Sequence, residues 1–209
     1  MGCRFVLHFD LILKMLEGNS MRVFFILLFV SSYVVADNNL LLARQAEQLP
    51  RIVIYDPSYR QINYPNGDVP QGYGVCSDVV IRSYRKIGID LQQLLHEDIK
   101  NNFSQYPSQK MWGLSKPDTN IDHRRVPNLE VFFSRKGITK PITSNAEDYL
   151  PGDIVSWRLD NGRPHIGIVT THRTVDNKRY LIMHNIGYGQ VSEDILFRWG
   201  IVGHYSYLK

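Results

Sequence analysis

Three residues of this chain have the types and the order that nucleophilic attack on an amide needs. Cys76 follows a glycine-rich turn and opens an apolar run typical of a helix. His165 begins an apolar stretch typical of a strand, and His184 lies near the end of the next such stretch. An imidazole can take the proton of a thiol and later give it to a leaving amine, while a third group orients the ring. Antiparallel neighbouring strands can place the two histidines side by side.

The position of Cys76 matters for its chemistry. At or near a helix N-terminus, unpaired N–H groups carry partial positive charge, which favours a thiolate and makes a better nucleophile. The alternative is a small buried hydrophobic residue at the base of the helix. The chain has one other cysteine, Cys3, which export would remove. A lone thiol is unusual in an exported protein, because such proteins tend to pair their cysteines or avoid them.

The N-terminal segment predicts export. Met21-Arg22 precedes the apolar run 23–35 and then Ala36, the parts of a secretory signal with cleavage near Ala36. The run is shorter than the about 20 apolar residues that a spanning helix needs, so we expect a secreted or periplasmic protein without a stable membrane span. An uncleaved anchor is the alternative. Residues 1–36 are thus predicted to be an extension plus signal peptide, and residues 37–209 a single domain.

Composition limits the class of protein. The 209 residues are 44% hydrophobic and 21% charged, which is typical of a globular chain that can form one sizeable domain. The net charge of +4 favours anionic partners such as a bacterial cell wall. The basic residues are scattered instead of forming one stripe, so we expect no nucleic-acid partner.

The elements that must position these residues follow an α+β plan. Predicted helices cover residues 38–49, 76–86 and 90–103, with a short helix or turn at 129–135. Turn residues punctuate 104–128, which is predicted to be loop-rich. From residue 153 the pattern favours strands at 154–157, 165–170, 180–185 and 201–207. Helices followed by an antiparallel sheet are compatible with one compact domain.

Several of these stretches carry a family resemblance. Residues 151–157 (Pro-Gly-Asp-Ile-Val-Ser-Trp), 165–169 (His-Ile-Gly-Ile-Val) and 183–185 (Met-His-Asn) resemble the NlpC-type papain-like cysteine peptidases of bacterial cell walls. More closely, the chain resembles a secreted bacterial domain family of unknown function. The stretches that carry this second resemblance are 64–68, 74–78, 121–128 and 184–187.

The resemblance implies a papain-like (NlpC-type) fold, with helices packed on a small antiparallel sheet. It implies that Cys76 is the nucleophile, His165 the base and His184 the orienting residue, and that the substrate is an amide, as in the stem peptides of peptidoglycan. No metal or other cofactor is expected. Asn185 is an alternative third residue, but alternation along a strand points it away from the face of His184.

Candidate substrate-binding residues surround the cysteine in the pattern. Arg124 and Arg125 form a basic pair whose guanidinium groups suit a substrate carboxylate, although such a cluster can also be a solvated surface. Tyr73 is expected to line the cleft, and Asp78 is a further candidate. The chain departs from the NlpC pattern at Val75, where that family has an aspartate that helps to recognise a free amino group.

Other functions remain alternatives at this stage. One alternative is a zinc site, although no two candidate ligands have metal-binding spacing on one element. The candidate ligands are His123, His165, His184, His204, Asp122 and Asp153. The other two alternative functions are a non-catalytic wall-binding module and an acyl-transfer enzyme. His123 and His204 are expected to be structural.

Overall fold

The computed structural model describes residues 38–208. The predicted extension and signal peptide at 1–36 lie outside the described residues. The chain from Asn39 onward groups into one compact unit. Among the helices of residues 38–208, none has both the length and the apolar character needed to cross a membrane.

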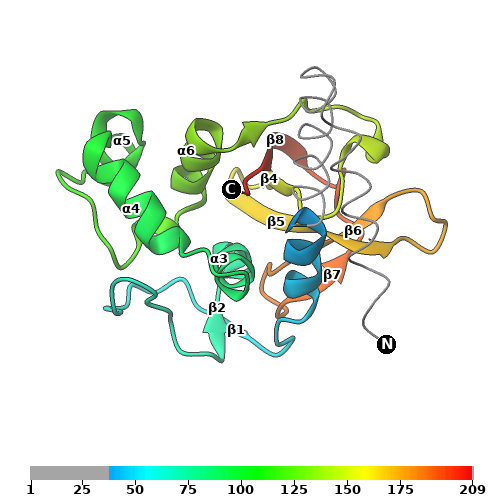
Figure 1. The fold of residues 1–209 in the computed structure, drawn as a ribbon, viewed down its shortest axis with the longest axis horizontal. Coiled ribbons are helices and arrows are strands. Elements are labelled where there is room, and N and C mark those ends of the chain that lie inside the picture. The colour runs from blue at the N-terminus through cyan, green and yellow to red at the C-terminus, as the bar shows by residue number, and fades with distance from the viewer. Residues whose placement is uncertain (1–37, 209) are drawn as a thin grey trace, which may run out of the picture. The chain divides into compact units, whose positions relative to one another are not determined.

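The helices form where the apolar periodicity predicts them (Figure 1). A helix covers residues 38–47, and α3 (Cys76–Lys86) and α4 (Leu91–Asn101) follow. Asp90 caps α4, because its side chain accepts a hydrogen bond from the backbone N–H of Gln92. The short helix predicted at 129–135 is α6 (Val126–Lys136), which starts earlier than expected.

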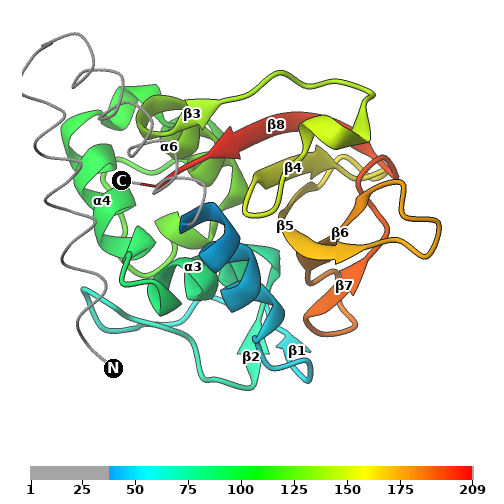
Figure 2. The same cartoon turned by 45° about the vertical axis from the view of Figure 1, so that its right-hand side comes forward.

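The strands build one antiparallel sheet of six, in the order β3-β8-β4-β5-β6-β7. Their bounds are β3 (Ile138–Thr139), β4 (Ile154–Arg158), β5 (Pro164–Arg173), β6 (Tyr180–His184), β7 (Val191–Glu193) and β8 (Gly200–Ser206). A separate parallel pair joins β1 (Ile54–Tyr55) to β2 (Tyr73–Gly74). In Figures 1 and 2, α4 and α6 lie to one side and β4 to β7 to the other, with α3 between them. The predicted α+β class is confirmed.

Each face of the sheet has its own apolar core. Ile154, Ile166 and Ile168 pack with the helices in the larger cluster, which includes Cys76. Val155 and Trp157, their neighbours in β4, point to the other face and pack in a second cluster. By this alternation His165, whose ring packs beside Trp157, lies on the face opposite Ile166 and the cluster that includes Cys76.

The prediction that residues 104–128 are mostly loop was wrong in part. They contain α5 (Ser108–Trp112) and two 3-10 turns, η1 (Phe103–Gln105) and η2 (Asp122–Arg124). The buried amide of Asn128 holds them together, since it accepts from Ser108 Oγ and donates to the carbonyl of Asp122. Elements of three to five residues are too short to show a periodic pattern, so the sequence gives no signal for them.

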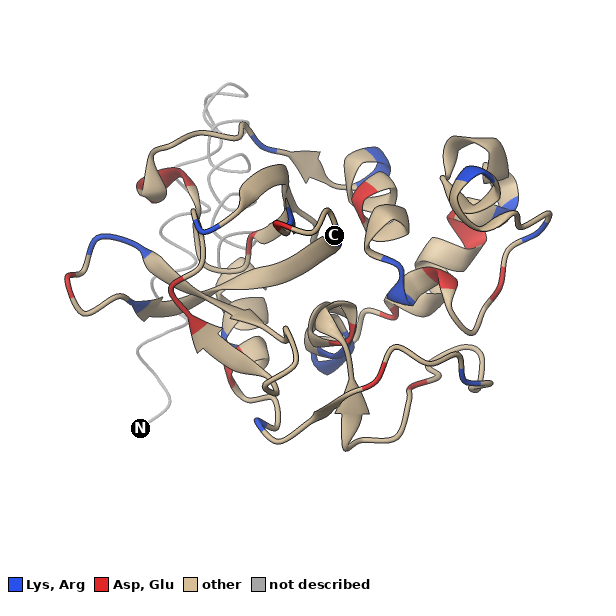
Figure 3. Cartoon of the chain, turned by 180° about the vertical axis from the view of Figure 1, so that it is seen from behind, with Lys and Arg blue, Asp and Glu red and all other residues tan. Residues whose placement is uncertain are grey.

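Acidic and basic residues are both spread over the described helices, strands and loops (Figure 3). Many are paired with each other, as in Arg158 with Glu130 and Arg179 with Asp194.

Candidate functional site

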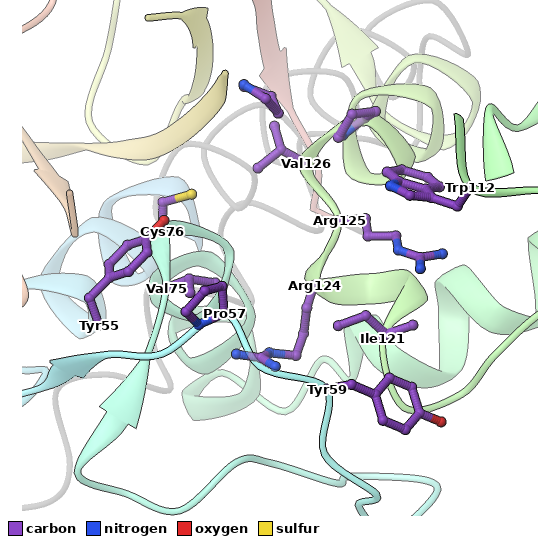
Figure 4. A pocket seen from close by; sticks show the side chains of 12 residues that line it. Tyr55, Pro57, Tyr59, Val75, Cys76, Trp112, Ile121, Arg124, Arg125 and Val126 are labelled. Atoms are coloured by element: carbon purple, nitrogen blue, oxygen red, sulfur yellow. The ribbon is translucent and has the colours of Figure 1, made fainter. Parts of the chain in front are cut away.

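Cys76 is the first residue of α3, and its thiol is almost fully buried. Three backbone amides face the sulfur: those of Ile166, Ser77 and Cys76 itself. The first two amides of a helix have no partner within the helix, so they are available to a ligand or a side chain. The sulfur points into a cavity of about 400 Å³ (Figure 4).

The helix N-terminus was expected to lower the pKa of the Cys76 thiol, but in the structure this pKa is raised. Burial raises the pKa of Cys76 to about 12, and the three amides that favour the thiolate do not offset the loss of solvation. A helix N-terminus supplies only partial charges, whereas removing a full negative charge from water costs several kcal/mol. In the ligand-free site, the proton therefore stays on the sulfur.

The two predicted histidines lie side by side in the sheet. His165 on β5 and His184 on β6 share a face, and their Nε2 and Nδ1 atoms are 3.0 Å apart. The rings of Trp157 and Trp199 flank His165 at centroid distances of 5.9 and 5.8 Å. This packing fixes the imidazole plane, and burial lowers the pKa of His165 to about 3, helped by His184.

A glycine allows this approach of the two strands. At Gly167 an added Cβ would lie 2.6 Å from Ile182 Cγ2 and 2.9 Å from the carbonyl oxygen of Met183. Any side chain there would push β6 away from β5. The His-x-Gly pattern thus has a physical reason, because the glycine lets His184 reach His165.

The thiol meets the histidine strand at its backbone. Ile166, whose amide faces the sulfur, directly follows His165, and Pro164, which directly precedes it, lines the cavity with Cys76. Within residues 38–208 no direct hydrogen bond joins the thiol to His165. Such bonds are often long before substrate binds. The Nδ1 atom of His165 is the ring nitrogen that remains once Nε2 has bonded to His184.

Strand alternation also settles the choice between the two candidate third residues. His184 faces His165, whereas Asn185 points the other way, and its side-chain amide lies 3.5 Å from the carbonyl oxygen of Gly74. Its oxygen accepts from the backbone N–H of Gly187, which shapes the turn after β6. Asn185 therefore serves the turn and does not contact the imidazole pair.

The cavity beside Cys76 is mostly apolar. The residues that line it are Tyr55, Pro57, Tyr59, Val75, Cys76, Trp112, Ile121, Arg124, Arg125, Val126, Pro127 and Pro164. Figure 4 shows the hydroxyl of Tyr55 beside the Cys76 sulfur. Burial raises the pKa of Tyr55 to about 12, with Cys76 as the next contribution, so this hydroxyl stays protonated and able to donate.

Tyr73, which the sequence placed in the cleft, is not among the residues that line it. β1 and β2 pair so that Tyr55 lies opposite Gly74 and Tyr73 lies opposite Ile54. Tyr73 instead stacks under the guanidinium of Arg60. Tyr55 takes the expected place, and no sequence pattern near Cys76 indicates it, because it comes from a strand about twenty residues earlier.

Arg124 and Asp78 are bound to each other. The guanidinium donates two hydrogen bonds to the carboxylate, each 2.9 Å long, and both side chains are only 3% exposed. Two further donors of Arg124 reach the carbonyl oxygens of Asp56 and Ser58. Asp78 also accepts from the backbone N–H of Val75 and so caps α3. Asp78 and Arg124 thus use most of their hydrogen-bonding groups within the fold, and the binding role expected for them stays a prediction.

Arg125 is differently placed. Its guanidinium lies 4.1 Å from the ring centroid of Trp112, and one nitrogen is 3.3 Å from Asp122. Figure 4 shows Arg125 and Trp112 together on the side of the cavity away from Tyr55. Stacking orients the guanidinium plane while part of its donor set stays available. Of the two arginines, only Arg125 has this freedom.

Neither His204 nor His123 is among the residues that line the cavity beside Cys76. His204 bonds the carbonyl oxygen of Pro141 and the carboxylate of Asp153, which also holds Lys140. His123 is buried, and desolvation lowers its pKa to about 3. Within the described part of the chain, no group of three or more histidine, cysteine, aspartate or glutamate side chains has a metal-binding arrangement. The histidines and aspartates considered for zinc are therefore not gathered in one place.

Fold and site together define an α+β protein with a buried helix-terminal cysteine against the backbone of β5, the strand that carries one of two hydrogen-bonded histidines. Residues 42–207 match the family described as "Domain of unknown function (DUF1287)", and the chain belongs to this family. "Uncharacterized protein YijF" of Escherichia coli (strain K12) is 54% identical over 175 residues, which are 83% of this chain and 84% of that protein. The predicted resemblance to a family of unknown function is confirmed.

One solved structure is also similar, that of NlpC1 from Trichomonas vaginalis. The similarity has a TM-score of 0.44 with 15% identity, and it covers 81% of this chain and 44% of that one. This chain thus spans less than half the length of that neighbour.

Proposed function

We propose that this protein is a cysteine-dependent hydrolase that cleaves an amide bond, with Cys76 as nucleophile, His165 as base and His184 as the residue that orients the base. The observation that carries the proposal is the environment of the thiol. Cys76 opens a helix, faces three backbone amides and a substrate-sized cavity, and lies beside the strand of a hydrogen-bonded histidine pair. A merely structural cysteine needs none of these neighbours.

The proposed reaction is acyl transfer to water in two steps. As the sulfur attacks the carbonyl carbon, the thiol proton moves to Nδ1 of His165. The C–N bond then breaks, and the leaving amine takes this proton. Water next attacks the thioester while His165 accepts its proton, and the S–C bond breaks to release a carboxylic acid. His165 finally returns the proton to the sulfur.

The amides at the start of α3 would stabilise the oxyanion of both steps. The N–H of Cys76 and that of Ser77 are close to the sulfur, and the Tyr55 hydroxyl provides a further donor on the same side. Removing one such donor typically slows a reaction about 100- to 1000-fold. Tyr55→Phe is therefore expected to lower kcat while leaving the fold intact.

The proposed substrate is the stem peptide of bacterial peptidoglycan, outside the cytoplasm. The N-terminal segment predicts export, and the mildly basic chain suits an anionic wall. Arg125 is proposed to hold a substrate carboxylate across the cavity from Cys76. Arg125→Gln should raise KM at least about tenfold for a carboxylate-bearing muropeptide, because a charge-assisted hydrogen bond is worth about 1.5–3 kcal/mol. The same peptide with that carboxylate amidated should bind both forms equally.

Mass spectrometry of peptidoglycan fragments tests the proposal most directly. Purified wild-type protein should release new peptide termini, whereas Cys76→Ala and His165→Ala should lose at least about a thousandfold in rate. The matched control is His172→Ala, a change in the exposed histidine of the same strand, and it should retain activity. Binding of peptidoglycan without any hydrolysis by the wild type would support a wall-binding module instead.

A further inference from the structure

We infer that Glu193 is a fourth member of the site, a positioning residue that fixes which nitrogen carries the proton in both imidazoles. This inference rests on the proposed function for its catalytic meaning. Its geometric basis is independent, since the carboxylate of Glu193 lies 3.0 Å from Nε2 of His184. The hydrogen-bonded chain therefore runs from Glu193 through His184 to Nε2 of His165.

Strand pairing explains why Glu193 reaches this histidine. β7 pairs with β6 so that Val191 lies opposite His184 and Glu193 lies opposite Ile182. Residues two apart on a strand share a face, so Glu193 is the diagonal neighbour of His184. A glutamate is long enough to cover a diagonal distance of about 7–8 Å between strands. The contact is therefore built by the register of the sheet.

The order of protons follows from what each group can do. A carboxylate can only accept, so Nε2 of His184 must carry its hydrogen and donate it to Glu193. A neutral imidazole has one N–H, which leaves Nδ1 of His184 as an acceptor. Nε2 of His165 must then donate to it, and Nδ1 of His165 keeps a free lone pair. That nitrogen is the one the proposed mechanism uses to take the thiol proton.

Without the carboxylate, the same two rings have a second arrangement. His184 can carry its hydrogen on Nδ1 and donate it to Nε2 of His165, which forces the hydrogen of His165 onto Nδ1. A histidine in that form cannot accept the thiol proton at Nδ1. Two neutral rings 3.0 Å apart do not choose between these arrangements by themselves. Glu193 supplies the choice, in the same way that a second partner fixes a histidine tautomer elsewhere.

Glu193 also affects the charge that His184 can carry. Burial lowers the pKa of His184, Glu193 opposes this effect, and Arg198 adds to it. His165 is the other titratable group in contact with the ring. Glu193 is thus the one negative group among these partners, so it also stabilises the positive charge that forms on the pair when His165 becomes protonated.

The experiment reads the tautomers directly. Protein carrying nitrogen-15 and carbon-13 labelled histidine is compared by NMR at pH 7.5 as wild type, Glu193→Ala and Glu193→Gln. In the wild type, both His184 and His165 should show the Nε2–H form. In Glu193→Ala, both should move toward the Nδ1–H form. Glu193→Gln should lie between them, because an amide can accept or donate.

The neighbouring Asp194 gives a matched control. It is an exposed carboxylate in the same segment, but it pairs with Arg179 and does not touch either histidine. Asp194→Asn should leave both tautomers unchanged. Glu193 is 47% exposed in its side chain, so its replacement is not expected to unfold the protein.

Activity gives the second measurement. Glu193→Ala should lower kcat about 10- to 100-fold with KM almost unchanged, by analogy with the loss seen when the hydrogen-bond partner of a metal-bound histidine is removed. Unchanged tautomers in Glu193→Ala, or the Nδ1–H form of His184 in the wild type, would overturn the inference. If the tautomers shift but no variant or wild type hydrolyses peptidoglycan fragments, Glu193 keeps its positioning role and the proposed function fails.

Discussion

Replacing Asp78 with asparagine should destabilise the fold strongly, because it removes the partner of a buried guanidinium. Arg124 is 3% exposed, and Asp78 receives both of its 2.9 Å hydrogen bonds. Breaking a buried ion pair by neutralising one partner typically costs about 3–5 kcal/mol. For a domain of this size, about 2–4 °C accompany each kcal/mol, so the melting temperature should fall by roughly 6–20 °C.

Denaturant and thermal unfolding of purified variants measure this effect. Asp78→Leu combined with Arg124→Met removes both charges, so it should be less destabilised than the sum of the single changes. Asp194→Asn, which breaks the exposed pair with Arg179, is the control and should cost less than about 1 kcal/mol. An Asp78→Asn protein as stable as that control would refute the structural role, and a raised KM at unchanged stability would return both residues to substrate binding.

Three further outcomes follow from the site. Alkylation of Cys76 by iodoacetamide should rise about tenfold per pH unit from pH 7 to 10, since its pKa is raised to about 12; a plateau below pH 8, seen by mass spectrometry, would contradict this. Gly167→Ala should cost about 1–3 kcal/mol in urea unfolding and reduce activity, because the new methyl would press on Ile182; wild-type behaviour would disprove the close approach. Buried His123 takes up a proton only near pH 3 in the folded protein but near pH 6.5 in the unfolded chain, so the free energy of unfolding should fall by about 2–3 kcal/mol between pH 6.5 and pH 4.5. His123→Gln should make this fall in stability smaller, whereas His172→Gln, at an exposed histidine, should leave it unchanged.

The sequence predicted those elements whose pattern of apolar and capping residues is local. The helix over 76–86 and the cap at Asp90 follow from apolar spacing and from a residue type that favours helix starts, so the structure has them where expected. Period-two alternation likewise separated His184 from Asn185. In each case the information lies within a few residues of the feature.

What the sequence could not predict depends on contacts between distant segments. Arg124 looked like an anion site because its partner Asp78 lies 46 positions earlier. Glu193 was missed because a glycine-containing turn separates it from His184, and only the register of β7 brings them together. Tyr55 reaches Cys76 through the parallel pairing of β1 with β2, which has no periodic signature in two-residue strands.

The ionisation of the thiol shows how such distant contacts change a chemical prediction. From the sequence, Cys76 had the favourable charge of a helix N-terminus and no visible cost. In the fold, β5 and the cavity walls exclude water from the sulfur, so burial outweighs the helix amides. Burial also keeps His165 neutral, which leaves both partners uncharged before substrate arrives. Nucleophile and base would then form together during attack, and the growing positive charge on the imidazole pair would need a counter-charge. Glu193 is the carboxylate in position to supply it, which explains why a half-exposed residue at the edge of the sheet belongs to the same site as a buried cysteine.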